Sequence, residues 1–236
     1  MTINKFKEYL AEMVPPVHQG GFDYEDHINH KLKAHGLQDP NRPSAGASAS
    51  GADGVIHRGT AEHKLEIKQN KNAMMGQIEL HHNGKEWHVS PNSKKKYPAT
   101  AAHIEKHFIH HVNASWKKPS GDYAKDLKMG NVSHHVKGTK AIRDHYGKDR
   151  KTEYMQIGGH SGLHHMHHDA GNMGTSELKG DTQFRARMKY RKTDKVTGKK
   201  HYGALVVMSL KNHNPEHHSA VNLEHDDHLK KIAKRK

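Results

Sequence analysis

Two acidic residues and a lysine stand where a turn runs into a short apolar segment. Asp53 follows a glycine and an alanine in the stretch SGADG, and the segment LEIK carries Glu66 and Lys68 two positions apart. Successive side chains of a strand point to opposite faces, so Glu66 and Lys68 are expected on one face, with Leu65 and Ile67 turned towards the core. The pattern predicts a strand that presents a carboxylate beside an ammonium group.

These groups are the ones that metal-dependent hydrolysis of a phosphodiester uses. Mg²⁺ prefers oxygen ligands and is usually held by one or two carboxylates together with water and substrate phosphate. Asp53 and Glu66 can supply the carboxylates if their two short strands pair, and the carbonyl of Ile67 is a further candidate ligand. Lys68 can orient the attacking water or stabilise charge in the transition state. We therefore expect Mg²⁺ or Mn²⁺ as the cofactor.

The alternative to a metal site is an ordinary surface strand. Glu-x-Lys triplets are common in proteins, and Glu66 and Lys68 could form a solvated cross-strand face, with Asp53 serving only as a turn residue. The glycine turn that delivers Asp53 and the apolar segment that carries the triplet favour the metal site.

The SGAD stretch followed by LEIK resembles the PD-(D/E)xK nuclease superfamily, whose members share the restriction-endonuclease-like fold. The resemblance extends over residues 20–90. It implies an α/β fold with a mixed central sheet flanked by helices, in which Asp53 and the pair Glu66 and Lys68 bind Mg²⁺ on adjacent strands. The sequence departs from the family pattern at Ala52, where a proline often stands.

Further site residues follow from this resemblance alone. Many members add an acidic residue from the helix before the Asp, and Glu25 in FDYEDHINHKL matches it, with Asp26 as the alternative. Some members carry a Gln in the helix after the Lys, and Gln77 in MMGQIEL matches it, with Gln69 as a nearer alternative. The segment YMQIGGHSGLHH, followed by FRARMKYR, is also similar to phage nucleases.

The composition fits a protein that binds polyanions. The 236 residues include 39 Lys and Arg against 25 Asp and Glu, a formal net charge of +14. Such a surface attracts phosphates, although it could also be a plain solvated face. Aromatic residues make up only 6%, so duplex DNA is expected in preference to stacked single strands. The residues expected to contact phosphates are Arg185, Arg187, Lys189 and Arg191 in FRARMKYR, and Lys94, Lys95 and Lys96 in SKKKY.

The residue types also exclude some chemistry. The chain has no Cys, which rules out disulfides, Cys-based zinc sites and thiol catalysis. Its 27 His residues are scattered and are expected mostly at the surface. The densest run, GGHSGLHHMHHDAG, leaves a zinc site of His164, His168 and Asp169 as an alternative, although no HExxH motif is present.

Hydrophobic spacing predicts a mixture of helices and strands. Apolar residues at helical spacing predict the helices, and Gly36 is a suitable C-terminal stop for one of them. The expected helices are residues 2–13, 22–36, 70–80 and 99–112. The expected strands are residues 55–56, 63–69, 84–90, 154–158, 182–191 and 202–210, the last two as a C-terminal β-hairpin.

The expected organisation is a single nuclease domain over residues 1–236. Its core is placed at about 20–112 plus 152–212, with a polar insertion at 113–151 and a basic, His-rich tail at 213–236. No stretch has the character of a signal peptide or a bilayer span. This predicts a cytoplasmic protein without a membrane partner, in a phage-infected bacterial cell if the phage resemblance holds.

The expected function is hydrolysis of DNA phosphodiester bonds by a metal-dependent endonuclease. Two alternatives are kept: a basic protein that coats nucleic acid without cutting it, and a His-rich metal-binding protein. The oligomeric state stays open, with a homodimer as one option.

Overall fold

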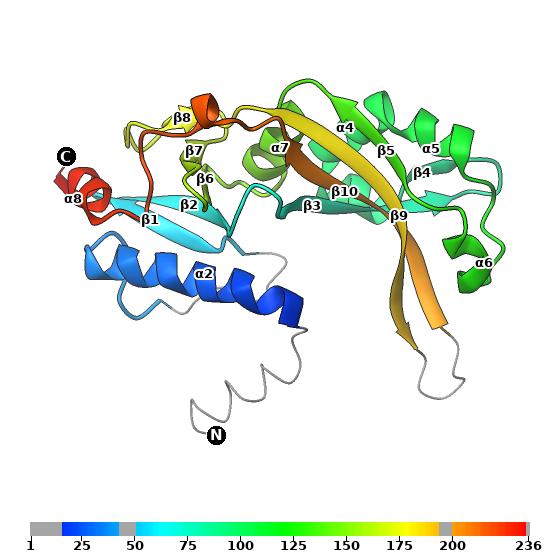
Figure 1. The fold of residues 1–236 in the computed structure, drawn as a ribbon, viewed down its shortest axis with the longest axis horizontal. Coiled ribbons are helices and arrows are strands. Elements are labelled where there is room, and N and C mark those ends of the chain that lie inside the picture. Colours follow the sequence, from blue (N-terminus) through cyan, green and yellow to red (C-terminus); the bar gives the residue numbers. More distant parts are fainter. Residues whose placement is uncertain (1–15, 43–50, 194–199, 235–236) are drawn as a thin grey trace. The chain divides into compact units, whose positions relative to one another are not determined.

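The computed structural model describes residues 16–42, 51–193 and 200–234 (Figure 1). Over these residues the chain is a mixed α/β protein with two five-stranded sheets, whereas one central sheet was predicted. It divides into two compact units, and each is described by itself. The first unit comprises Met1–Lys71, Thr152–Glu177 and His218–Lys236, and the second comprises Asn72–Lys151 and Leu178–His217. The helix predicted at residues 2–13 lies outside the described residues.

The first unit is built on a mixed sheet. Its strand order is β1-β2-β6-β7-β8, with antiparallel pairing of β1 with β2 and of β6 with β7. The pairs β2–β6 and β7–β8 are parallel. Its elements are α2 (Pro16–Ala34), β1 (Gly54–Arg58), β2 (Ala61–Lys68), β6 (Tyr154–Ile157), β7 (Gly162–His165), β8 (Ser176–Glu177) and α8 (Asp226–Lys234).

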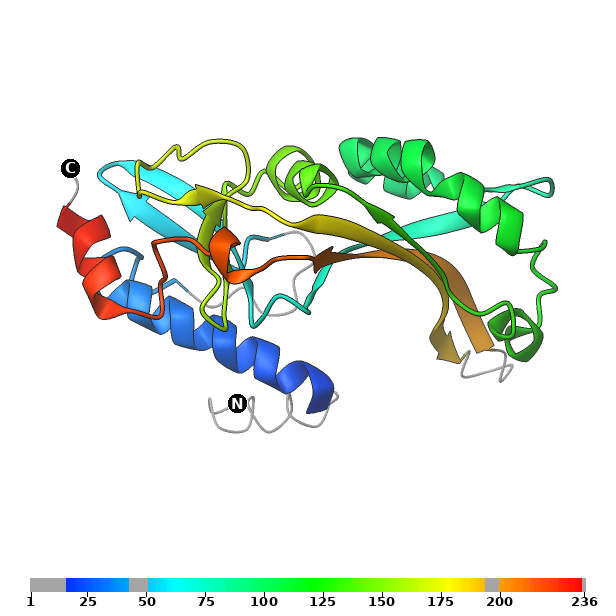
Figure 2. The same cartoon turned by 45° about the horizontal axis from the view of Figure 1, so that its top comes forward.

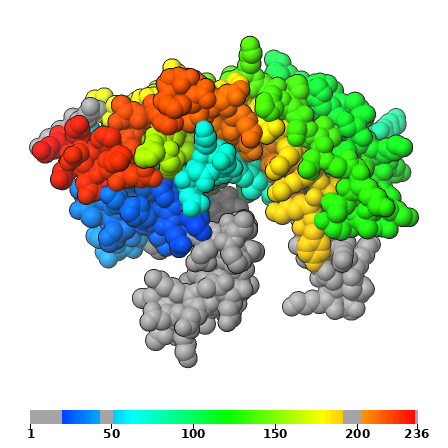
Figure 3. Space-filling model, in the orientation of Figure 1, coloured from blue at the N-terminus to red at the C-terminus, as the bar shows by residue number. Residues whose placement is uncertain are grey.

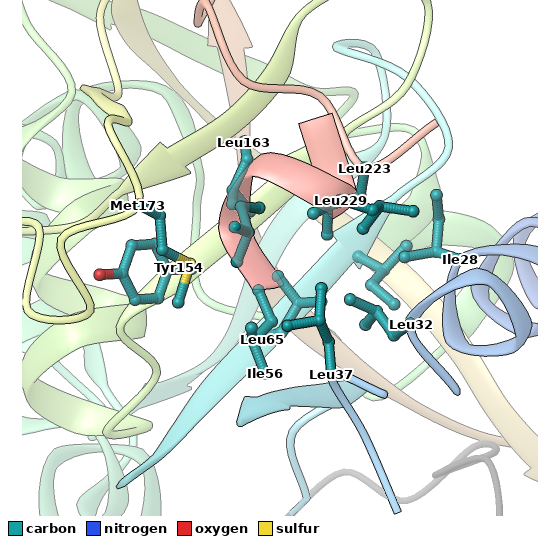
Figure 4. Close-up of a cluster of buried hydrophobic side chains, with 12 residues drawn as sticks. Ile28, Leu32, Leu37, Ile56, Leu65, Tyr154, Leu163, Met173, Leu223 and Leu229 are labelled. Carbon is teal, nitrogen blue, oxygen red and sulfur yellow. The ribbon is translucent and has the colours of Figure 1, made fainter. Parts of the chain in front are cut away.

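The core of the first unit joins one face of β2 to both helices (Figure 4). Leu65 and Ile67 are buried in it, as the alternation in LEIK predicted, and they pack with Ile28 of α2 and Leu229 of α8. The His-rich tail is therefore helical at its end and part of the core. Burial of these apolar side chains fixes which face of β2 carries Glu66 and Lys68.

The end of α2 is fixed by its predicted stop residue. Gly36 has a positive φ of 68°, and its N–H donates to the carbonyl of Lys33 at 3.0 Å. The N–H of Leu37 donates to the carbonyl of Leu32 at 2.9 Å, which completes a Schellman motif. The carbonyl of Leu37 then accepts from the N–H of His57 in β1 at 2.7 Å, so the helix end is tied to the sheet.

The second unit is built on an antiparallel sheet of order β4-β3-β10-β9-β5. The predicted hairpin is confirmed as β9 and β10. Helices α4 and α5 cover one face of this sheet (Figure 2). On that face the ring of Phe108 stacks on that of Phe184, with centroids 5.6 Å apart. The elements are β3 (Met74–His82), β4 (Trp87–Val89), α3 (Pro91–Lys96), α4 (Pro98–His107), α5 (Ile109–Ser115), α6 (Tyr123–Leu127), β5 (Val132–Val136), α7 (Lys140–Asp144), the π-helix η1 (His145–Asp149), β9 (Asp181–Thr193), β10 (Lys200–Lys211) and the short 3₁₀ turn η2 (Pro215–His217).

The helix predicted at residues 70–80 is wrong, because this segment forms strand β3. Val207 of β10 pairs with Gln77, and Ser209 pairs with Met74. Two steps along β10 therefore match three steps along β3, so β3 holds one extra residue. This bulge lies at Gly76, whose φ is 126°, and shifts the alternation of buried residues by one. Apolar residues on the two sides of the bulge thus acquire a spacing that imitates a helix.

Two further segments of the second unit form regular elements. Residues 91–96 form helix α3, with Ser90 as N-cap accepting from the N–H of Ser93 at 3.2 Å. The polar stretch at 113–151 contains α6, β5 and α7, and β5 pairs with β9 as the edge strand of the sheet. That segment is part of the second unit's fold.

Candidate active site

The structure brings together the three residues that carry the predicted chemistry. The Nζ atom of Lys68 lies 2.5 Å from Oε1 of Glu66 and 3.9 Å from Oδ2 of Asp53. The same Oδ2 atom of Asp53 accepts the backbone N–H of Ile67 at 2.8 Å. Glu66 is buried, with 1% of its side chain exposed, while 11% of Asp53 and 17% of Lys68 are exposed. The two carboxylates and the ammonium group form one cluster at the end of the β1–β2 pair.

The pairing of the strands explains why these groups meet. Asp53 directly precedes β1, and the β1–β2 register ends with Gly54 opposite Leu65. The carbonyl of Lys68 accepts from the N–H of Gly158, which directly follows β6. Backbone groups of successive strand residues point to opposite edges, so the N–H and carbonyl of Ile67 point to the other edge of β2. At that edge β1 has ended, and the carboxylate of Asp53 meets the N–H of Ile67. The predicted carbonyl ligand therefore faces the same edge as Asp53.

Strand β2 contains a second Glu-x-Lys triplet, which differs from the first in its exposure to solvent. Glu62 and Lys64 precede Glu66 and Lys68 by one repeat of four residues and are exposed. Glu62 contacts Arg42 at 3.4 Å in a surface ion pair. The sequence spacing of the two triplets is identical, and burial beside Asp53 distinguishes the one at residues 66–68.

Helix α2 brings Glu25 to the same cluster through a buried asparagine. The Nδ2 atom of Asn29 donates to the carbonyls of Glu25 at 2.9 Å and of Asp53 at 3.1 Å, and its Oδ1 accepts from Gln38 at 3.0 Å. A Cβ at Gly54 would lie only 2.6 Å from Oδ1 of Asn29, so glycine is required there for the close approach. Asn29 thus fixes α2 against the start of β1, and sequence reasoning missed it.

The pKa of Glu25 reflects the burial and the charges around its carboxyl group. Burial and the negative charge of Asp53 raise the pKa of Glu25 to about 8, with Glu66 adding to the rise and Lys68 opposing it. The neighbouring carboxylates of Asp53 and Glu66 thus disfavour the charged form of Glu25, and the ammonium group of Lys68 offsets them only in part.

The oxygen donors fit a hard divalent ion. Among residues 16–42, 51–193 and 200–234, no three His, Cys, Asp or Glu side chains are arranged as a ready-made metal cluster. Mg²⁺ and Mn²⁺ require fewer protein ligands, because water and phosphate complete the coordination. Asp53, Glu66 and the carbonyl of Ile67 offer the oxygen atoms that these ions prefer.

The glutamine predictions divide between the two units. Gln77 lies on β3 in the second unit, in a strand and not in the expected helix, whereas the cluster belongs to the first unit. Gln69 directly follows β2, and its side-chain amide would lie 3.0 Å from a Cβ added at Gly20 of α2. Asp26, the alternative to Glu25, is exposed.

A second buried amide holds the other side of α2, and sequence reasoning missed it too. Gln156 of β6 lies opposite Ile67, and its Nε2 donates to the hydroxyl of Tyr24 at 3.3 Å and to Oδ1 of Asn222 at 2.9 Å. The hydroxyl of Tyr24 donates to Glu224 at 2.9 Å. This network joins β6, α2 and the tail beside Glu25. The only sequence signal for this network was a Gln inside the apolar segment YMQIG.

The predicted phosphate contacts all belong to the second unit. Arg185 and Lys189 are exposed on β9, and Arg187 is partly exposed, on the face opposite Phe184. The side chain of Arg191 lies outside the described residues. On α3, Lys94, Lys95 and Lys96 are exposed, and Lys94 pairs with Glu105 at 2.5 Å.

The densest His run is a strand and a loop, and not the helix that a His164–His168 pair needed. His164 is fully buried on β7, and its Nε2 lies 3.1 Å from Oγ of Ser161, whereas His168 is exposed. Asp169 accepts from the hydroxyl of Tyr154 at 2.7 Å and from backbone N–H groups of the loop that follows. These contacts give Asp169 a structural role in that loop.

Comparison of the chain with protein-family models, with curated proteins and with solved structures finds no match. Among the described helices, none is both long enough and apolar enough to cross a membrane.

Proposed function

We propose that the protein is a metal-dependent nuclease that hydrolyses DNA phosphodiester bonds. One observation carries the proposal: Asp53, Glu66 and Lys68 converge at the edge of β2 to which the carbonyl of Ile67 points. A mixed sheet with helices packed on it supports a restriction-endonuclease-like fold for the first unit. The PD-(D/E)xK resemblance and the geometry of the cluster point to the same chemistry.

Each residue has a distinct role in this proposal. Asp53 and Glu66, with the carbonyl of Ile67, would hold Mg²⁺ or Mn²⁺, which when bound lowers the pKa of water and offsets charge on the phosphate. Lys68 orients the attacking water and stabilises the negative charge that develops on the phosphoryl oxygens. Glu25 would serve as a further ligand or as an outer-sphere base. Its pKa of about 8 keeps it largely protonated near neutral pH, and a bound cation would favour the charged form that accepts a proton.

The substrate class follows from charge. A net charge of +14 favours a polyanion, and the exposed Arg185 and Lys189 are proposed to contact its phosphates. Phosphate contacts position a nucleic acid without reading its sequence. The proposal therefore assigns cleavage to the first unit and much of the binding to the second.

The decisive experiment is cleavage of supercoiled plasmid with Mg²⁺ or Mn²⁺ by matched pairs of variants. Glu66→Gln and Lys68→Ala should each lower the rate by about 100-fold or more, the loss typical of a group that stabilises the transition state. Glu62→Gln and Lys64→Ala remove the same residue types at the same spacing on the same strand, and should cut like the wild type. Undiminished cutting by Glu66→Gln or Lys68→Ala would remove the assignment.

The same samples test the non-catalytic alternative, which the positive charge also favours. A protein that only coats nucleic acid would bind plasmid with an affinity that falls steeply with salt and would cut it with neither ion. Binding without any cutting by the wild type would therefore favour that alternative over the nuclease.

A further inference from the structure

In the second unit α6 lies beside the β9–β10 hairpin, and both reach the surface in the space-filling view (Figures 1 and 3). Large apolar side chains of both elements are exposed. Tyr190 of β9 is 41% exposed and Leu127 of α6 is 49% exposed. Tyr123 is on the same helix as Leu127, and its ring centroid lies 6.3 Å from that of Tyr190. We name Tyr123, Leu127 and Tyr190 the tyrosine patch. In the described part of the chain, only Met74 is a comparably exposed large apolar residue.

The patch is held in place by buried hydrogen bonds beneath it. Asp126 is 3% exposed and accepts from the hydroxyl of Tyr202 at 2.6 Å and from the N–H and hydroxyl of Ser120, both at 2.8 Å. Burial alone would raise the pKa of Asp126, but these hydrogen bonds outweigh it and keep the pKa below its ordinary value. Asp122 caps the first turn of α6. A five-residue helix is not stable alone, so these contacts set the orientation of Tyr123.

The surroundings of the patch are basic. Lys125 and Lys128 are exposed on α6, whereas Lys189, next to Tyr190 in sequence, points to the other face of β9. The exposed acidic residue of α6 is Asp122, at its N-cap, while Asp126 is buried and fully engaged. Exposed aromatic rings among cationic side chains suit a partner that offers flat rings and negative charge together.

We propose that the tyrosine patch binds single-stranded nucleic acid, with a base stacked on Tyr190 and the backbone phosphates facing Lys125 and Lys128. A duplex keeps the faces of its bases covered by their neighbours, whereas a single strand offers them to a protein ring. The inference rests on the proposed function in taking nucleic acid as the partner. It adds that the second unit engages unpaired strands, where the low aromatic content had favoured duplex contact alone.

Binding can be measured in EDTA, so that cleavage plays no part. The probes are a fluorescently labelled mixed-sequence single strand and the duplex of the same length. Tyr190→Ala should weaken binding of the single strand by about 5- to 100-fold, the range for loss of one stacked base, and should leave duplex binding unchanged. Tyr190→Phe keeps the ring and should bind like the wild type. Met74→Ala is the matched control for loss of an exposed apolar side chain and should have no effect.

Three results would overturn the proposal. The first is wild-type affinity of Tyr190→Ala for the single strand, with unchanged thermal unfolding. The second is full binding by Tyr190→Leu, which would show an apolar surface for another protein and no stacking. The third is an unchanged salt slope in Lys125→Ala/Lys128→Ala, because each lost phosphate contact should reduce the slope for single strands by about 0.7. Since no divalent ion is present, these results stand whether or not plasmid is cut.

Discussion

The two units each hold a cluster of charged side chains, and the clusters differ in their balance of charge. Among the described contacts of the first unit, the carboxylates of Glu25, Asp53 and Glu66 lie around the ammonium group of Lys68. In the second unit the carboxylate of Asp144 contacts the basic side chains of His103, Lys140 and Lys148, and Arg143 interacts with it electrostatically. The carboxylates of Glu66 and Asp144 are both buried, so burial of a carboxylate by itself does not distinguish the clusters.

The cluster of the second unit satisfies its buried charge. Nε2 of His103 lies 2.8 Å from Asp144, and the ammonium groups of Lys140 and Lys148 lie 2.5 Å and 3.2 Å away. Burial alone would raise the pKa of Asp144, but the hydrogen bonds from these three groups lower it to about 2. The carboxylate is therefore stabilised in its charged form and serves to join α7 to α4.

The sign of the imbalance is what separates a candidate site from a structural one. Glu25 has its pKa raised to about 8, which means that the folded chain disfavours its negative charge. A protein retains such a cluster at a cost in stability unless a cation binds there. The excess of carboxylates in the first unit is thus the physical signature that supports a metal-binding role.

The largest change in stability is expected from removal of the carboxylate of Asp144. Asp144→Asn leaves the basic groups around it without their shared partner, and should cost about 3 kcal/mol of stability. At about 2–4 °C per kcal/mol, the unfolding temperature should fall by roughly 6–12 °C in calorimetry. Glu66→Gln, measured without metal, should change stability by no more than about 1 kcal/mol, because it also relieves repulsion. Equal losses from the two variants would show that the clusters do not differ in kind.

A smaller effect is expected from the pH dependence of Glu25. A carboxyl group whose pKa is raised on folding contributes stability that is fully present below its unfolded value of 4.5 and is lost as pH rises through about 8. Glu25→Gln in EDTA should therefore match the wild type near pH 5 and exceed it by about 1 kcal/mol, or 2–4 °C, near pH 9. Thermal unfolding across this range measures the difference. Asp26→Asn, on the exposed side of the same turn, should show no such trend. A stability difference between Glu25→Gln and the wild type that does not change with pH would contradict the raised pKa of Glu25.

Sequence reasoning found what depends on short-range patterns. The alternation of LEIK predicted that Glu66 and Lys68 share a face, and the structure confirms it because burial of Leu65 and Ile67 leaves no other choice. The stop at Gly36 was found in the same way, because only its local conformation decides it.

What sequence reasoning missed depends on partners far along the chain. The bulge at Gly76 exists because β3 pairs with β10, more than a hundred residues away, so Gln77 could not be placed correctly from local spacing. Asn29 acts through the carbonyls of two separate segments, and nothing in its own sequence neighbourhood marks that role. The division into two sheets has the same cause, because it depends on which distant strands pair.

The smallest change in stability is expected from removal of one of the lysines that contact Asp144. Lys140 is 64% exposed and is one of several basic groups around Asp144, so Lys140→Ala should cost less than about 1 kcal/mol. Lys148 is 53% exposed, and Lys148→Ala should behave alike. Each loss should shrink further in high salt, because exposed charges are screened, while the effect of Asp144→Asn should largely persist. Thermal unfolding at low and high ionic strength provides the measurement. A loss from either lysine as large as that from Asp144→Asn would mean that a single ion pair, and not the surplus of basic groups, stabilises the buried carboxylate.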